Sequence, residues 1–332
     1  MVVFVFAVLG VMAQYINPND NYFFTYASLG LPFVLTLAVL IFVYTALKKS
    51  WFFIVPLLAL AINYQFITSY IGFGGLFNMK ETTGNFKIKV ATYNVHGFNY
   101  CEGYVPINDI ADYIQNESVD ILCMQEYMPN YMYSDKELRS AFWYLENQYI
   151  RTSSLDVIGL AIYSKYPIKN NGTVNFPQSA NGAIWADVIL PDSSIVRVIN
   201  VHMQTTGVNK GYRLGISGTI INLSDNAKTR AQQAHLIETL IDNTKHPIIL
   251  AGDFNDIPSS YTFNILKGDL NDNFKQGGIG PGGTFKGKFS FLRLDNILSS
   301  NEFVCKKYFC SSKEWSDHFP VIAKFEMIGD DQ

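Results

Sequence analysis

Residues Pro247–Asn255 read PIILAGDFN, an apolar run that passes directly into a carboxylate and an amide. Apolar residues that stop abruptly at Asp-x-Asn indicate a buried strand whose last side chains reach the rim of a sheet. Because side chains alternate along a strand, Asp253 and Asn255 point the same way and face one common site. A carboxylate beside an amide suits a hard cation, an attacking water or a phosphate oxygen. Alone, the run also fits a polar turn after a strand, since Asp, Asn and Gly are turn residues.

Further polar clusters follow other apolar runs in the same way. They are Thr92–Gly97, Gln125–Glu126, Asn200–His202 and Trp315–Pro320. Asp295 differs, because it lies inside the strand-like run Leu292–Leu298, where an unpaired charge is costly. A histidine is a suitable partner for it. Each cluster also has a plain structural interpretation: Glu126 as a surface strand end, His202 as a half-buried histidine, and Asp317-His318 as a turn.

The chain after residue 86 alternates short apolar strands with a few helices. The predicted helices are Ile107–Gln115 and Thr229–Ile241. The predicted strands are Lys87–Thr92, Val119–Met124, Gly159–Tyr163, Ile184–Leu190, Ile195–Val201, Pro247–Ala251, Leu294–Leu298 and Val321–Phe325. This order favours a mixed α/β domain with two sheets over a parallel sheet with regular crossovers.

The first 73 residues have the composition of a membrane region. Ala27–Leu47 is uncharged and long enough to cross a hydrocarbon core of roughly 30 Å, and Trp51–Phe73 is a second uncharged stretch. Val2–Ala13 is apolar but short, and we interpret it as a transmembrane helix whose beginning is missing from the sequence. Signal-peptide cores and buried helices of a soluble protein are the alternatives.

The charges around these stretches predict the orientation in the membrane. Lys48 and Lys49 form the only basic loop, which the positive-inside rule places in the cytoplasm. Everything after about residue 75 then lies on the extracytoplasmic side of an inner membrane. We expect three parts: a transmembrane region 1–73 with two to three helices, a linker 74–86 and a domain 87–332.

Charge and cysteine content limit the function classes. Residues 81–332 contain 22 basic and 27 acidic residues, so the domain lacks the overall positive charge typical of nucleic-acid binders. Four cysteines are too few for a disulfide framework, although Cys305 and Cys310 are close enough for one local bridge.

Taken in order, the motifs resemble those of the endonuclease/exonuclease/phosphatase superfamily, the metal-dependent phosphohydrolases related to DNase I. The resemblance covers residues 86–327. Its motifs are Tyr93-Asn94-Val95, Gln125-Glu126, Gly159–Ile168, Asn200-Val201-His202, Gly252–Asn255, Arg293-Leu294-Asp295 and Ser316-Asp317-His318. The segment Thr229–Ala234, together with the membrane region, is similar to bacterial membrane members. The chain departs from the inositol 5-phosphatase pattern, with Phe291–Asp295 in place of its Pro-x-Trp-x-Asp-Arg signature.

The resemblance implies a four-layer α-β-β-α sandwich with the active site at one edge, here preceded by the transmembrane helices. It implies that Asn94 and Glu126 hold a divalent cation, with Asp317 completing its shell or a second metal site. Asp253 would orient or deprotonate the attacking water, and Asn255 would position that water or the phosphate. His202 and His318 would donate to phosphate oxygens or transfer protons, with Asp295 orienting His318.

The expected function is therefore that of a membrane-anchored phosphoesterase that uses Mg²⁺, with Mn²⁺ or Ca²⁺ as alternatives. It would hydrolyse a phosphodiester or phosphomonoester by in-line attack of water. The expected partners are a phosphate-ester substrate (lipid, nucleotide or nucleic acid) and the lipid bilayer. Two alternatives stay open: a nuclease acting on extracytoplasmic DNA or RNA, and a catalytically silent binding or scaffold domain on the same fold.

Overall fold

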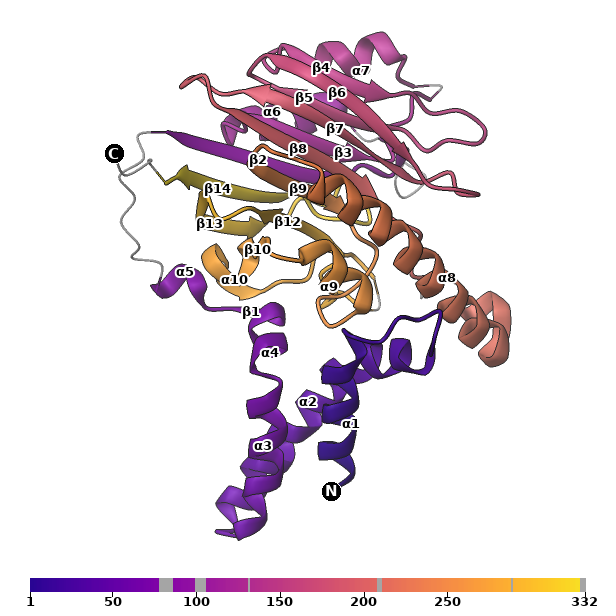
Figure 1. The fold of residues 1–332 in the computed structure, drawn as a ribbon, viewed down its shortest axis with the longest axis vertical. Helices are drawn as coiled ribbons and strands as arrows, with labels where there is room; N and C mark the ends of the chain where they lie inside the picture. Colours follow the sequence, from indigo (N-terminus) through magenta and orange to yellow (C-terminus); the bar gives the residue numbers. More distant parts are fainter. Residues whose placement is uncertain (78–85, 99–105, 131, 208–210, 288, 329–332) are drawn as a thin grey trace. The chain divides into compact units, whose positions relative to one another are not determined.

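The computed structural model (Figure 1) describes residues 1–77, 86–98, 106–130, 132–207, 211–287 and 289–328. The chain divides into two compact units. The first, called the helical unit here, comprises Met1–Tyr70, Gln204–Glu238 and Asp256–Gly268. The second, called the sheet unit, comprises Ile71–Met203, Thr239–Asn255 and Asp269–Gln332. The predicted linker 74–86 begins with a short helix, α5 (Gly74–Phe77), and its residues 78–85 lie outside the described residues.

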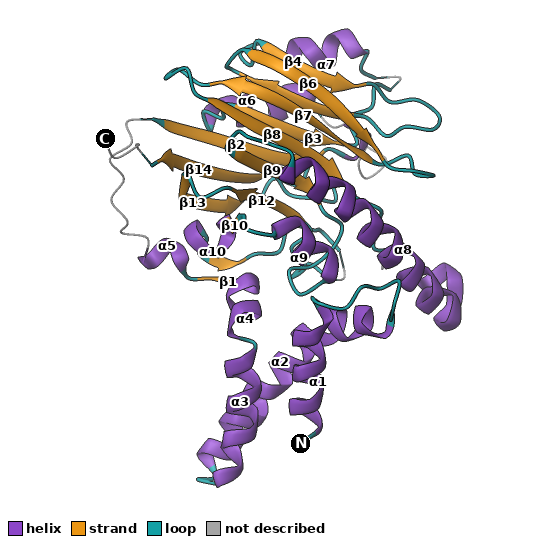
Figure 2. Cartoon of the chain, viewed as in Figure 1, coloured by secondary structure: helices purple, strands orange, loops and turns teal. Residues whose placement is uncertain are grey.

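Two six-stranded sheets make up most of the sheet unit (Figure 2). The strand order is β10-β12-β9-β8-β7-β6 in one sheet and β13-β14-β2-β3-β5-β4 in the other. The bounds are β2 (Lys87–Asn94), β3 (Ile121–Gln125), β4 (Asn147–Arg151), β5 (Leu160–Ser164), β6 (Ile168–Asn175), β7 (Gly182–Ile189), β8 (Ile195–His202), β9 (Ile248–Asp253), β10 (Asn271–Asp272), β12 (Asp295–Ser299), β13 (Phe303–Cys310) and β14 (Val321–Met327). A small pair, β1 (Ile71–Gly72) and β11 (Gly280–Pro281), completes the strands of the described residues.

Alternation along the strands fills two layers of core. Val90 and Ile121 point inward and pack with Ile249 and Ile297 of the other sheet, so the two sheets bury one shared core. In the sheet that contains β2 and β3, the residues that alternate with the inward-facing ones point outward and pack under the helices α6 (Ile107–Asn116) and α7 (Asp135–Ala141). Each buried aliphatic side chain contributes about 1.5–3 kcal/mol. The predicted mixed α/β fold with two sheets is confirmed, and each predicted strand overlaps an observed one.

A buried amide pair links the two sheets next to their polar edge. Gln125, the last residue of β3, donates from Nε2 to Oδ1 of Asn200 on β8 at 2.6 Å. Asn200 in turn donates from Nδ2 to the carbonyl oxygens of Met124 and Ala161, at 2.8 and 2.9 Å. Both side chains are fully buried. Because buried amides need partners, this network fixes how the two sheets meet at that edge.

The N-terminal part of the helical unit contains α1 (Val2–Ala13), α2 (Phe23–Leu47), a 3₁₀ turn η1 (Trp51–Phe53), α3 (Ile54–Ile62) and α4 (Tyr64–Tyr70). Small residues allow close packing: Ala7, Ala38 and Ala59 meet in one cluster. A Cβ at Gly10 would lie 2.5 Å from Cδ1 of Leu31, so α1 and α2 approach each other at this glycine. The outward faces of α2 remain apolar, with Leu40 63% and Val43 46% exposed.

Among the described residues, α2 is the one helix that is both long and apolar enough to cross a membrane by itself. The second predicted stretch, Trp51–Phe73, is not one straight helix, because α3 and α4 are bent by 66° at Asn63. The buried Asn63 amide donates to the carbonyl oxygens of Ala7 and Ala59, at 3.2 and 2.9 Å. Its side chain therefore joins α1 to α3 at the bend. By length and composition the bent pair is a second candidate span.

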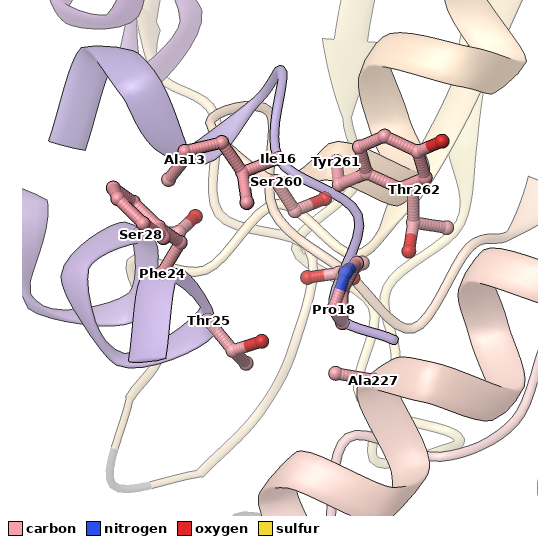
Figure 3. A pocket seen from close by; sticks show the side chains of 11 residues that line it. Ala13, Ile16, Pro18, Phe24, Thr25, Ser28, Ala227, Ser260, Tyr261 and Thr262 are labelled. Carbon is pink, nitrogen blue, oxygen red and sulfur yellow. The ribbon is translucent and has the colours of Figure 1, made fainter. Parts of the chain in front are cut away.

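Two further helices belong to the helical unit, α8 (Gly211–Asp242) up to Glu238 and α9 (Tyr261–Lys267). The Tyr26 hydroxyl donates to the carbonyl oxygen of Ile220 at 2.8 Å, and the hydroxyls of Ser28 and Ser259 lie 3.1 Å apart. Figure 3 shows a small cavity in this unit, lined by α2, α8 and α9 residues and by the turn before α2. The helix α8 starts well before the predicted Thr229.

The local disulfide that the spacing of Cys305 and Cys310 permits is not formed in the structure. The Cys305 thiol bonds instead to the carbonyl oxygen of Lys307 at 3.5 Å, and the Cys310 thiol to that of Ser311 at 3.7 Å.

Replacing Asn200 with leucine tests the link between the sheets. Asn200→Leu removes the acceptor of Gln125 and two bonds to carbonyl groups, so we expect the free energy of unfolding to fall by about 2–4 kcal/mol. Urea unfolding of the full chain in detergent, followed by tryptophan fluorescence, measures this change. Asn175→Leu, at an exposed position on β6, is the matched control and should change stability by less than about 0.5 kcal/mol. Equal stabilities of the two variants would contradict the role of the link.

Candidate active site

Every site residue predicted from the sequence lies at one edge of the sheet unit, where strands of both sheets end. Asn94 ends β2, and Glu126 directly follows β3. In the other sheet His202 ends β8, Asp253 ends β9 and Asp295 begins β12. The backbone register aligns the last three, since His202 pairs with Asp253 across a parallel ladder and Asp295 pairs with Asp253 across an antiparallel one.

Asp253 is fully buried and is the centre of the cluster. Its Oδ2 accepts from Nδ2 of Asn94 at 3.1 Å and from Nδ2 of Asn255 at 3.0 Å. Its Oδ1 accepts from the backbone N–H of Asn255 at 2.8 Å. Asp253 and Asn255 therefore meet, as predicted, but across the turn that follows β9, because the strand ends at Asp253 and alternation does not extend to Asn255. Burial, with the nearby charge of Asp295 in addition, raises the pKa of the Asp253 carboxyl to about 6.

The backbone conformation on either side of Asp253 favours particular residue types. Gly252 has φ 145°, and a Cβ there would lie 2.0 Å from the carbonyl oxygen of Val201 on the paired strand. Asn255 has φ 50°, a left-handed conformation that Asn accepts more readily than most residues. Strain of this kind is held in place by the surrounding sheet and is typical of functional sites.

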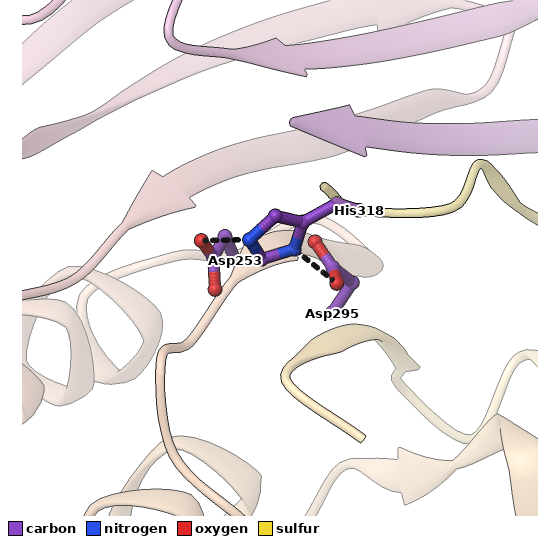
Figure 4. A group of neighbouring side chains, drawn as sticks. All are labelled: Asp253, Asp295 and His318. Carbon is purple, nitrogen blue, oxygen red and sulfur yellow. Dashed lines mark hydrogen bonds and ion pairs between the residues drawn. The ribbon is translucent and has the colours of Figure 1, made fainter. Parts of the chain in front are cut away.

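His318 lies between two carboxylates (Figure 4). Its Nδ1 is 2.8 Å from Oδ2 of Asp295, and its Nε2 is 3.7 Å from Oδ2 of Asp253. Asp295 thus has the histidine partner that the sequence predicted. Burial alone would lower the pKa of His318, but the charges of Asp295 and Asp253 outweigh burial and raise the pKa to about 10. The imidazolium form is therefore favoured, and its charge offsets the two buried carboxylates.

Glu126 lies at the open side of the cluster, where the buried Asn94 side chain bonds to it. Nδ2 of Asn94 donates to Oε1 of Glu126 at 3.1 Å, and the Glu126 side chain is 25% exposed. Glu126 has φ 54°, which turns the chain at the end of β3. An amide can present either its nitrogen to carboxylates or its oxygen to a cation. Glu126 and Asp317 carry carboxylate oxygens and Asn94 an amide oxygen, the donor types that Mg²⁺, Mn²⁺ and Ca²⁺ prefer. Among the described residues, the group whose ligand atoms lie close enough together to share one ion is Asp253, Asp295 and His318.

His202 faces the carboxylate of Asp253 on its own sheet and that of Glu126, which follows a strand of the other sheet. Its Nε2 lies 3.6 Å from Oδ2 of Asp253 and 3.8 Å from Oε1 of Glu126. The other ring nitrogen, Nδ1, is buried and has no hydrogen-bond partner among the described residues. The ring is 4% exposed, so its position is fixed by packing, and its Nε2 edge is directed at the polar cluster.

Asp317 is joined to a residue that the sequence analysis did not select, His96. Nδ1 of His96 lies 3.3 Å from Oδ1 of Asp317 and 3.6 Å from Oε2 of Glu126. The contact with Asp317 raises the pKa of His96, and it lowers the pKa of Asp317 in spite of the burial of that carboxyl. His96 is two residues after Asn94, the same spacing as between Asp253 and Asn255. This spacing was the signal in the sequence that could have identified His96 as a site residue.

The turn that carries His96 is tightly held. His96, Gly97 and Phe98 have φ values of 47°, 62° and 56°, three successive left-handed residues. The backbone N–H of Gly97 donates to the carbonyl oxygen of Glu126 at 3.0 Å, and that of His96 donates to Oδ1 of Asn94 at 3.1 Å. This turn keeps the His96 ring beside the two carboxylates while its side chain is 44% exposed.

Comparison with known proteins agrees with this arrangement. A sequence model of the endonuclease/exonuclease/phosphatase family matches residues 91–318, and a model of a domain of unknown function (DUF8431) matches residues 1–70. No curated protein matches the chain.

Three solved structures illustrate the fold. An endonuclease/exonuclease/phosphatase from Bacteroides vulgatus is 18% identical, covering 73% of this chain and 100% of that one, with a TM-score of 0.57. A mannosyl-6-phosphatase from Bacteroides thetaiotaomicron is 20% identical over 73% and 100%, with a TM-score of 0.52. The catalytic domain of human Nocturnin with bound sulfate is 14% identical over 73% and 94%, with a TM-score of 0.55.

At these identities the solved structures show the fold alone, whereas the family match spans more than half of the chain and contains the whole polar edge from Asn94 to His318. The chain therefore belongs to the endonuclease/exonuclease/phosphatase family, whose members are metal-dependent hydrolases of phosphoric esters.

Proposed function

We propose that this chain is a membrane-anchored phosphoesterase that requires Mg²⁺ and hydrolyses a phosphodiester or phosphomonoester by in-line attack of water. The observation that carries the proposal is the position of Asp253. Its buried carboxylate is held by two amides and faces two histidines, so it is oriented before any substrate arrives. A fixed carboxylate of this kind can orient a water molecule and accept its proton.

Glu126 and Asn94 would hold the Mg²⁺ ion, with Asp317 as a further oxygen ligand. A cation bound there would stabilise the negative charge that builds up on the phosphate oxygens in the transition state. Mn²⁺ or Ca²⁺ could be held by the same oxygen donors. His96 lies between Glu126 and Asp317, and it would keep the two carboxylates at a fixed separation.

The histidines and Asn255 would act on the phosphate and on protons. His202 would donate from Nε2 to a phosphate oxygen, since that atom already faces the carboxylates of the site. His318 would do likewise or transfer a proton, while Asp295 fixes its ring through Nδ1. Asn255 would position the attacking water or the phosphate. Donors placed in advance where charge develops are usually the largest contribution to such catalysis.

The N-terminal helices would anchor the domain in the inner membrane. The long apolar helix α2 is only 17% buried over its most apolar window, whereas the core helix of a soluble protein is mostly buried. Lys48 and Lys49 directly follow α2 and favour a cytoplasmic loop at this end. With this orientation, the catalytic domain would work on the extracytoplasmic side.

The charge of the domain favours some substrates over others. The domain has 22 basic and 27 acidic residues after residue 80, so its net charge does not attract a long polyanion such as DNA or RNA. A lipid headgroup or a small phosphate ester such as a nucleotide is therefore the preferred substrate class, and extracytoplasmic nucleic acid is the alternative. A silent scaffold is disfavoured, because every expected donor is present and oriented.

A substrate panel tests the proposed function. We expect the full chain in detergent or vesicles to hydrolyse at least one phosphate ester among phospholipids, sphingomyelin, inositol phosphates, nucleotides, DNA and RNA. Hydrolysis should stop with a chelator and return with Mg²⁺, Mn²⁺ or Ca²⁺, because the site has oxygen ligands. Activity that is insensitive to chelation, or none on any member of the panel with any of the three cations, would refute the proposal.

Two substitutions separate an enzyme from a binding domain. Glu126→Ala removes the main metal ligand and His318→Ala removes the charge between two buried carboxylates, so each should lower hydrolysis by at least about 100-fold. Circular dichroism should show that both variants keep the fold. Glu146→Ala and His246→Ala, at positions that belong to no polar cluster of the site, are the matched controls and should leave the rate unchanged. Full activity of either site variant would exclude the mechanism.

A further inference from the structure

The chain segments that follow two of the proposed catalytic strands both continue into the helical unit. After β8 the chain passes into that unit between Met203 and Gln204, and after β9 between Asn255 and Asp256. Within the sheet unit these segments are already tied together. The N–H of Met203 donates to the carbonyl oxygen of Asp253 at 3.0 Å, and Nδ2 of Asn255 donates to the carbonyl oxygen of Met203 at 3.1 Å.

One buried arginine binds both segments just beyond that point. Arg230 on α8 is fully buried, and its Nε donates to Oδ2 of Asp256 at 3.0 Å. Its Nη1 donates to the carbonyl oxygens of Gln204 and Thr205, at 3.3 and 3.1 Å. All four residues belong to the helical unit.

A glutamine one turn further along α8 adds a fourth bond. Oε1 of Gln233 accepts from the backbone N–H of Gln204 at 2.8 Å. Arg230 and Gln233 are three residues apart and therefore lie on the same face of the helix. That face of α8 therefore bonds to the segment after His202 at one backbone N–H group, that of Gln204, and at two carbonyl groups, those of Gln204 and Thr205. This assigns a role to the run Thr229–Ala234, which the proposed mechanism leaves without one.

The energetics favour a positioning role over a stabilising one. A buried ion pair loses most of its Coulomb attraction to desolvation, and apolar residues of similar size often give equal or greater stability. A guanidinium group, however, presents several donors in one plane, so it can bond a carboxylate and two carbonyl groups together. Lysine has a single ammonium group and cannot reproduce this planar, forked arrangement of donors.

We propose that Arg230 is a positioning residue, which fixes His202 and the Asp253–Asn255 pair by holding the segments that follow them. The inference rests on the proposed function, because it concerns the efficiency of that reaction. Arg230 itself touches neither substrate nor metal. Its effect passes along two short stretches of backbone, from Gln204 back to His202 and from Asp256 back to Asn255.

The test compares two arginine–aspartate pairs in the full chain, the buried pair of Arg230 with Asp256 and the partly buried pair of Arg197 with Asp187. Arg230→Lys keeps the charge but loses the fork, so kcat should fall by about 10–100-fold while KM changes less than threefold, as expected for misplaced catalytic groups. Arg197→Lys is the matched control. Arg197 on β8 binds Asp187 at 2.7 and 2.9 Å, at the opposite end of that strand from His202. Its kcat should stay unchanged even if its stability falls.

A second readout does not depend on activity. Met203 is fully buried, belongs to the first tied segment and is bonded through its backbone to the second, so its ¹³C-methyl NMR signal, assigned with Met203→Leu, reports their placement. The signal should shift or broaden in Arg230→Lys and stay in place in Arg197→Lys. An unchanged Met203 signal with wild-type kcat would overturn the positioning role. If the wild-type chain hydrolyses no ester, the proposed function fails, while the Met203 signal still decides whether Arg230 holds the two segments.

Discussion

The active edge depends on one buried contact, the hydrogen bond between Gln125 and Asn200. Neither sheet holds the whole site: one contributes Asn94 and Glu126, and the other contributes His202 and Asp253. Gln125 directly precedes Glu126, and Asn200 is two residues before His202. A shift of one sheet relative to the other would break this bond and would leave two buried amides without hydrogen-bond partners, which is costly in a core. The network therefore sets the spacing between the two halves of the site.

The second constraint is charge. Asp253 and Asp295 are fully buried carboxylates, and two such charges side by side would be unfavourable without compensation. The His318 ring supplies it from between them, and amides satisfy the oxygens of Asp253. Asp295 Oδ1 has no hydrogen-bond partner among the described residues, so the compensation comes chiefly through the histidine. The cluster thus keeps an excess of negative charge, which suits both a bound cation and a proton acceptor.

The sequence was informative wherever an apolar run ends or is interrupted at a polar residue. Asp253 with Asn255, and Asp295 with a histidine, could be predicted because apolar runs end or are interrupted at these positions. His96 was missed although it follows Asn94 at the same spacing, because its approach to Asp317 depends on three successive left-handed residues that no periodicity reveals. The early start of α8 was missed because its apolar spacing is clear only from Thr229. Likewise, the bend at Asn63 depends on a tertiary bond to α1.

The central claim is that residues from two sheets form one catalytic centre, and a double-mutant cycle between Glu126 and Asp253 tests it most directly. The measurement is kcat/KM for wild type, Glu126→Gln, Asp253→Asn and the double variant on one ester. Groups that act as a unit are strongly non-additive, so the double variant should be about as slow as the slower single variant. Losses that multiply in full would show that the two residues act independently and would contradict the account.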